Sequence, residues 1–268
     1  MVLRSALRLQ SLVFLFSWLA IAACKGQASA AEEIRLHLSY LPHRLTEDAS
    51  RQYALLVEEL LAGANISVDR QLAPLKRTTA LFKADPGSCV FPANVVALNM
   101  GDKASEVVAL ETVDIVSVRL YTARQNNVGA TLEDFAPERV GYIRGSGALH
   151  LLGPNAERFR AINSEEQLIS MLELGRLDAF LGHHPDTALA LDDLGKPGAL
   201  HAAALPFKNL EFRVSFVCHD NETGERFLKS INPRIRALRR SGRLEEILGP
   251  HADLFETDRS EENGPLIK

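Results

Sequence analysis

The chain has 268 residues, of which 46% are hydrophobic and 24% are charged, and this composition is typical of a soluble globular protein large enough for two lobes. Its formal charge at pH 7 is −4, and it becomes −7 without the three cations of the first 30 residues, Arg4, Arg8 and Lys25. The acidic surplus argues against a general nucleic-acid binder, because such a protein needs a basic surface.

Residues 1–30 are predicted to be an export signal. Two arginines precede an apolar run at 12–23 that is too short to span a bilayer comfortably. Two processing routes stay open. Cleavage after the small residues 28–30 releases a soluble protein, whereas acylation of Cys24 anchors a lipoprotein. On either route we expect a periplasmic location, with contact to the membrane only through a lipid anchor.

Strand and helix patterns alternate through the first part of the chain. Strands are predicted at 34–38, 66–72 and 88–91. Thr46 is expected to cap a helix over 47–61, and Pro74 opens a second helix that ends near 84.

The segment 107–123 is β-prone and is interpreted as two strands, the second of which crosses between two lobes. A connector at 131–135 then leads into the stretch 139–186, on which the prediction of the second lobe depends.

That stretch is predicted to fold as strand, helix, strand, helix, strand. A buried strand at 140–143 runs into a glycine-containing turn and a helix at 148–152. Ser164 and Gln167 form the sequence pattern of a capping box, Gly175 is placed to end that helix, and 177–181 is again a buried strand. Such a unit implies a parallel sheet with ligand-facing loops at the carboxyl ends of its strands.

The rest of the chain is expected to return to the first lobe. A helix at 187–194 precedes strands at 200–205 and 212–218, and helices follow at 221–240 and 244–248. The predicted division is a signal at 1–30, a first lobe at 31–120 with a return segment at 206–250, a second lobe at 121–205, and a loosely held polar tail at 251–268.

Two short motifs resemble those of type II periplasmic solute-binding proteins, the family 3 group that mostly serves ABC transporters. One runs from Asp134-Phe135 through Val140-Gly141 to Gly145-Ser146, and the other from Leu174 to Ala179. The resemblance implies an α/β protein of two lobes, each a mostly parallel sheet flanked by helices, joined by two crossing strands that act as a hinge. It also implies a small solute as ligand and a membrane permease or a sensor protein as partner, and we expect a monomer.

The resemblance also indicates where a ligand is held. The candidate ligand-binding residues are Tyr40, Arg77, Pro92, Asn94, Arg144, Gly145, Ser146, Gly147, His183 and Asp186. The turn at 144–147 joins backbone donors, a helix start and a guanidinium, which together suit an anion. Two anchors of amino-acid binders are missing, since no arginine follows the third strand and histidines stand in place of an aspartate at 183. A small polar or anionic organic solute is therefore expected rather than a standard amino acid.

Cys89 and Cys218 are candidates for a disulfide in an oxidising compartment, and the alternative is two separate buried thiols. Neither a metal nor another cofactor is expected, because neighbouring histidines on an extended segment point in opposite directions.

Three functional hypotheses follow. The leading one is an exported binding protein that captures its solute by hinge closure and has no catalytic residues. A second is an accessory protein of an exported oxidoreductase or receptor that keeps the fold without a small ligand. A third is an enzyme that resembles cyclohexadienyl dehydratases, with Asp186 and His183 or His184 as its best acid–base candidates.

Overall fold

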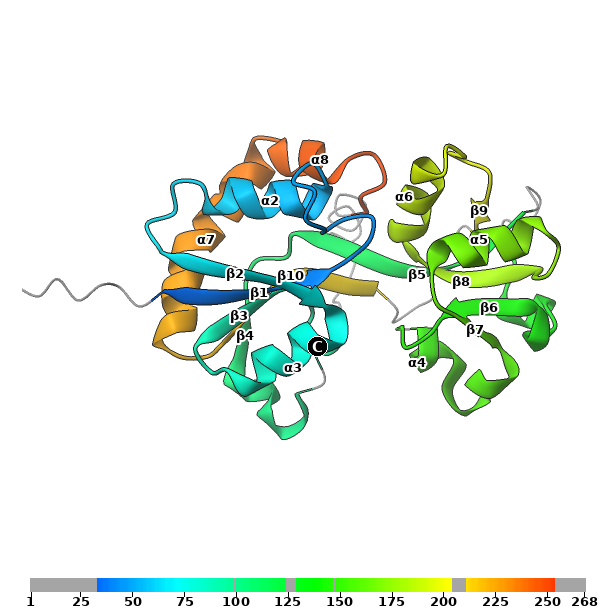
Figure 1. Ribbon diagram of the computed structural model, residues 1–268, viewed down its shortest axis with the longest axis horizontal. Helices are drawn as coiled ribbons and strands as arrows, with labels where there is room; N and C mark the ends of the chain where they lie inside the picture. The colour runs from blue at the N-terminus through cyan, green and yellow to red at the C-terminus, as the bar shows by residue number, and fades with distance from the viewer. Residues whose placement is uncertain (1–32, 99, 124–128, 147, 204–210, 254–268) are drawn as a thin grey trace, which may run out of the picture. The chain divides into compact units, whose positions relative to one another are not determined.

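The computed structural model describes residues 33–98, 100–123, 129–146, 148–203 and 211–253 (Figure 1). The predicted signal at 1–30, Cys24 within it, and Gly147 lie outside the described residues. Within the described ranges, no helix combines the length and the apolar character needed to cross a membrane.

The strands belong to one sheet, whose order is β2-β1-β3-β10-β5-β8-β6-β7, with β4 paired to β10 and β9 to β5. The strands are β1 (Ile34–Tyr40), β2 (Val68–Pro74), β3 (Ser88–Ala93), β4 (Val107–Ala109), β5 (Asp114–Thr122), β6 (Val140–Ile143), β7 (Arg160–Ile162), β8 (Ala179–His184), β9 (His201–Ala202) and β10 (Glu211–His219).

Helices follow most of the strands. The α-helices are α2 (Gln52–Leu61), α3 (Leu75–Ala84), α4 (Ala148–Leu152), α5 (Glu165–Glu173), α6 (Asp186–Asp193), α7 (Glu222–Arg240) and α8 (Arg243–Leu248). The 3₁₀ turns are η1 (Gly101–Glu106), η2 (Leu132–Asp134), η3 (Pro137–Arg139) and η4 (Gly153–Arg158).

Two parallel groups of strands lie on either side of an antiparallel pair. Strands β2, β1 and β3 run parallel, as do β8, β6 and β7. Between them β5 and β10 pair antiparallel, and each also pairs with one of the two groups. We call β1 to β4 with their helices the first lobe, and β6 to β9 with theirs the second lobe. The predicted fold, two α/β lobes joined by two crossing strands, is confirmed.

Successive side chains of the central strands enter different cores, which explains their continuous apolar runs. In β3, Phe91 packs with the core that also contains α2, α7 and α8, whereas Val90 packs with Phe82 of α3 on the other face. In β8, Leu181 joins the core under α4 and Phe180 joins the core under α5 and α6. Figure 1 shows helices on both sides of the strands in each lobe.

Two helices begin with the side-chain caps that their sequences favour. The Ser164 hydroxyl accepts a hydrogen bond from the Gln167 backbone at 3.3 Å, and the Asn221 side chain accepts one from the Gly224 backbone at 3.0 Å. Such caps satisfy backbone donors that a helix leaves free at its start.

The predicted start of the second element is wrong, because α2 begins at Gln52 rather than at Glu47. Leu41 and Leu45 exchange two backbone hydrogen bonds of 2.9 Å, and this tight turn buries the side chain of Arg44. The Thr46 hydroxyl accepts a hydrogen bond from the Asp48 backbone and so caps a turn instead of a helix.

Strand β9 pairs with β5 beside the second lobe. One prediction about the end of the chain needs correction. Residues 251–253, predicted to begin a loosely held tail, are tied to the fold, since His251 contacts Asp192 at 2.7 Å and Asp253 binds Arg119.

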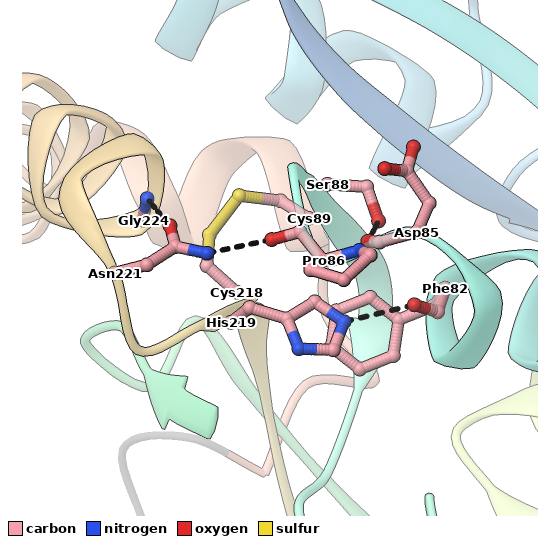
Figure 2. Close-up of a disulfide and its surroundings, with 9 residues drawn as sticks. All are labelled: Phe82, Asp85, Pro86, Ser88, Cys89, Cys218, His219, Asn221 and Gly224. Carbon is pink, nitrogen blue, oxygen red and sulfur yellow. Dashed lines mark hydrogen bonds between the residues drawn. A yellow bond between two sulfur atoms is a disulfide. The ribbon is translucent and has the colours of Figure 1, made fainter. Parts of the chain in front are cut away.

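Cys89 of β3 and Cys218 of β10 form a disulfide at a sequence separation of 129 (Figure 2). Closing a loop of that length lowers the entropy of the unfolded chain, and this stabilises the folded state by on the order of 5 kcal/mol. Beside the disulfide, His219 stacks on Phe82 and binds its carbonyl oxygen at 2.8 Å, while the Asn221 amide donates to the Pro86 carbonyl at 2.7 Å. The disulfide therefore fixes a crossing strand to the first lobe.

Candidate functional site

The candidate site lies where β8 ends and α6 begins. Gly182 precedes the two histidines, and a Cβ there would collide with the Thr187 hydroxyl and come within 3.1 Å of Tyr121. Glycine is thus the residue that lets α6 begin close to the strand. His183 and His184 then face different partners, as their alternation along β8 predicts.

Arg44 is the most buried cation of this region, with 1% of its side chain exposed. Its guanidinium lies 3.8 Å from the centre of the Tyr53 ring and binds Asp114, the first residue of β5. Asp114 also accepts hydrogen bonds from the Tyr53 hydroxyl and the Ile115 backbone, each at 2.8 Å. Burial and the charge of Asp186 raise the pKa of Tyr53 while Arg44 lowers it; burial is the largest effect and the net shift is upward, so the phenol stays a donor.

Arg44 also connects the two lobes. Its Nη1 atom lies 3.7 Å from Oδ2 of Asp186, the first residue of α6. The Nε and Nη1 atoms have no hydrogen-bond partner among the described residues, although both are buried. Because buried guanidinium groups normally donate all their hydrogen bonds, the Nε and Nη1 atoms of Arg44 are available to a further acceptor.

His43 makes a second connection between the lobes. Its Nδ1 atom is 2.8 Å from Asp193 of α6 and its Nε2 atom is 3.2 Å from Glu166 of α5. Both contacts are hydrogen bonds only when the ring carries both protons. Arg51 adds two bonds of 2.9 Å to Asp193. Burial raises the pKa of Asp193. The hydrogen bonds and charges of His43 and Arg51 together lower it by more, so the net shift is downward.

His183 belongs to a small polar cluster in the second lobe. Its Nδ1 atom lies 3.7 Å from Glu165, whose carboxylate accepts a 3.0 Å hydrogen bond from the Thr187 hydroxyl. Burial lowers the pKa of His183, whereas the nearby Glu165 carboxylate and the charge of Asp186 raise it. The net shift is upward.

His184 belongs to another cluster, centred on Asp253. Its Nε2 atom is 3.4 Å from that carboxylate, which also binds Arg119 of β5. The Tyr121 hydroxyl lies 3.2 Å from the Nδ1 atom of His184. A cavity of about 180 Å³ adjoins these groups, and its lining combines apolar side chains such as Leu191 and Leu200 with Arg119, Asp192 and His251. The end of the described chain therefore holds β5 and β8 together.

The structure brings some of the predicted ligand residues near one another and separates others. His183 and Asp186 share the neighbourhood of Arg44 and Glu165. Tyr40 ends β1 and is 45% exposed, and Arg77 is exposed in the first turn of α3.

Asn94 makes hydrogen bonds within its own turn and to β10. Its side chain accepts from the Val96 and Ala97 backbone, just after the half-buried Pro92, and donates to the Arg213 carbonyl at 3.0 Å.

The turn at 144–146, predicted to bind an anion, makes its hydrogen bonds to other residues of the second lobe. Arg144 donates to Asn163 at 3.3 Å and to the Ala161 carbonyl at 3.1 Å. Gly145 adopts a φ of 76°, and the Ser146 hydroxyl accepts from the Ala148 backbone at 3.3 Å. Among the described residues, no hydrogen bond or ion pair joins this turn to His183 or Asp186.

Sequence reasoning missed several residues of the site, namely His43, Arg44, Asp114, Glu165 and Asp253. Asp114 did carry a signal, because a carboxylate inside an otherwise apolar β-prone run is buried only when it is paired.

No protein-family model and no curated protein matches the sequence. Solved structures do match. The chain is similar to the GluR0 ligand-binding core from Nostoc punctiforme in complex with L-glutamate, at 13% identity and a TM-score of 0.61, over 80% of this chain and 96% of that one.

Two further matches cover a similar share of this chain. A histidine kinase sensor domain described as similar to periplasmic binding proteins shares 14% identity at a TM-score of 0.61, over 81% and 94% of the two chains. The L-cystine solute receptor of Neisseria gonorrhoeae, in an unliganded open conformation, shares 14% at 0.57, over 80% and 90%. At these identities the comparisons show the fold, which is the type II periplasmic-binding-protein-like fold.

Arg44→Met should lower the free energy of unfolding by about 3–5 kcal/mol, because it leaves the Asp114 carboxylate buried without its cation. Arg70→Met is the matched control, since Arg70 pairs with Glu58 on the surface and such pairs contribute about 0–1 kcal/mol. Urea unfolding followed by circular dichroism measures both losses. Equal losses in the two variants would contradict this account of Arg44.

His183 should stabilise the fold most in mildly acidic solution. Its folded-state pKa is raised above 6.5, so the stabilisation is complete below the unfolded-state pKa and is lost as the pH rises through the folded-state value. The difference in unfolding free energy between the wild type and His183→Gln, measured by urea unfolding from about pH 5 to about pH 8, should therefore shrink.

The control for that series is Leu174→Asn, because Leu174 is 63% exposed and carries no titrating group. Its difference from the wild type should stay nearly constant over the same range. A His183 difference that grows with pH would show that the ring is held neutral.

Proposed function

We propose that this chain is an exported ligand-binding protein that captures a small polar or anionic organic solute by closing its two lobes around it. The complex is then read by a membrane permease or a sensor protein. Catalysis is not part of the proposed function.

The observation that carries this proposal is a set of polar contacts between segments on opposite sides of the crossing strands. Arg44 meets Asp186 at 3.7 Å, and His43 meets Asp193 at 2.8 Å. Rotation about β5 and β10 would break these contacts or form them, with little change inside either lobe. If the open and closed arrangements have similar free energies, a ligand that binds the closed one can shift the population toward it.

The proposed ligand contacts come from both lobes. The first lobe supplies Tyr40, Arg77, Pro92 and Asn94, and the second supplies Arg144, Gly145, Ser146, His183 and Asp186. Arg44, with two buried donors unused among the described residues, is added to this set. A solute that bridges the two groups stabilises the closed arrangement.

The solved structures of similar fold support a ligand-binding role but not a particular ligand. One neighbour is a glutamate complex and another is an L-cystine receptor. In this chain the turn after β3 carries Val95, Val96 and Ala97, with no arginine to clamp an amino-acid carboxylate. We therefore propose a different anionic or polar solute.

The disulfide and the leader support export, because disulfides persist in oxidising compartments. A membrane permease and a sensor protein are both candidate partners, and a kinase sensor domain is among the neighbours of similar fold.

A thermal-shift screen tests the proposal. Amino acids, dicarboxylates, sugar acids, phosphonates and apolar monocarboxylates are added singly, and a ligand present at about 100 times its Kd should stabilise the fold by about 2.7 kcal/mol. Each compound that raises Tm is then titrated by calorimetry and incubated with the protein to look for turnover. Absence of any stabilising compound would favour the accessory role, and turnover of a hit would favour an enzyme.

A further inference from the structure

Three large apolar side chains are exposed at one edge of the first lobe. They are Tyr40, Leu75 and Val96, which are 45%, 52% and 79% exposed. Single exposed apolar residues are common on proteins and need no explanation. These three, which we call the apolar edge, follow the carboxyl ends of three neighbouring strands.

The pairing of the strands brings the apolar edge together. Tyr40 at the end of β1 is paired with Pro74 at the end of β2, and Leu75 is the next residue. Strand β3 lies on the other side of β1 and ends at Ala93, three residues before Val96. Figure 1 shows β1, β2 and β3 side by side, with α3 following β2. In open α/β sheets, ligands bind at this end of parallel strands.

The turn that carries Val96 is held in place. The Asn94 side chain accepts hydrogen bonds from Val96 at 2.9 Å and from Ala97 at 3.2 Å, and the Asn94 carbonyl accepts one from Leu98. Leu98 is buried against Phe82 of α3. The exposure of Val96 is thus a property of an ordered turn.

Two cations stand at the same edge. Lys76 and Arg77 are exposed in the first turn of α3, immediately after Leu75, and that turn contains no acidic residue. Neither side chain has an ion pair among the described residues. An apolar surface beside unpaired cations is complementary to a molecule with an apolar body and an anionic head.

We propose that the ligand is a small organic anion with an aromatic or branched aliphatic body. The body lies on the apolar edge, and its carboxylate pairs with Lys76 or Arg77. This inference rests on the proposed function and narrows its class of solute. A dicarboxylate of similar length is disfavoured on this surface, because its second charge would lose water against Leu75 and Val96, whose side chains donate no hydrogen bond.

Isothermal titration calorimetry with 3-phenylpropionate and 4-methylpentanoate, compared with succinate and glutarate, tests the inference. The two apolar monocarboxylates should bind the wild type at least tenfold more tightly than the dicarboxylates. Leu75→Asn should weaken 3-phenylpropionate binding about tenfold, because one apolar contact is lost. Val96→Ala should weaken it about threefold, and this side chain is too exposed for its truncation to unfold the protein.

Leu174→Asn is the matched control, since Leu174 is 63% exposed beyond the end of α5 in the second lobe, and its affinity for 3-phenylpropionate should equal that of the wild type. Unchanged affinity in both Leu75→Asn and Val96→Ala would overturn the inference. Tighter binding of a dicarboxylate would also overturn it while leaving the proposed function intact. If no compound of either kind bound and the broader screen also gave no hit, both would fail.

Discussion

A buried ion pair between Arg44 and Asp114 fixes the point at which the chain first crosses from one lobe to the other. Two opposite charges removed from water are stable only when their hydrogen bonds are supplied, and here Tyr53 and the Ile115 backbone supply those of the carboxylate. The turn at Leu41 and Leu45 holds the guanidinium in place. The start of β5 is therefore rigid on the side of the first lobe.

From that fixed point the polar contacts become weaker toward the second lobe. Arg44 reaches Asp186 at 3.7 Å, whereas its partner Asp114 is bound directly. The other contacts between the lobes, such as His43 with Asp193, involve half-exposed carboxylates that water can solvate when they separate. A strong anchor on one side and exchangeable contacts on the other are suited to a hinge. In our proposal, the lobes close over a ligand held on the apolar edge and paired with the cations beside it.

The sequence predicts most of the fold because its signals are local. Ser164 and Asn221 cap helices whose first turns they begin, and the apolar runs of β3 and β8 mark strands buried on both faces. The prediction of where α2 starts is wrong because it depends on a contact that is not local in sequence. Thr46 is a good helix cap by itself, but the burial of Arg44 depends on Asp114, which lies 70 residues further along the chain. Sequence patterns cannot show a contact of that kind.

The site was harder to predict than the fold, for the same physical reason. His183 and Asp186 could be found because they lie at the end of a predicted strand, whereas Arg44 and Asp253 act through partners distant in sequence. The anion site at Arg144 stays a prediction: its guanidinium donates hydrogen bonds to Asn163 and to the Ala161 carbonyl within the second lobe.

The distance between the lobes tests the account most directly. Spin labels are attached at Lys103→Cys in the first lobe and Leu174→Cys in the second, both exposed positions, in a chain that also carries Cys24→Ser. Pulsed electron paramagnetic resonance then measures the distance between the two labels. We predict two distance populations, with the shorter one favoured by any solute that raises Tm. A single distance distribution that such a solute leaves unchanged would contradict hinge closure.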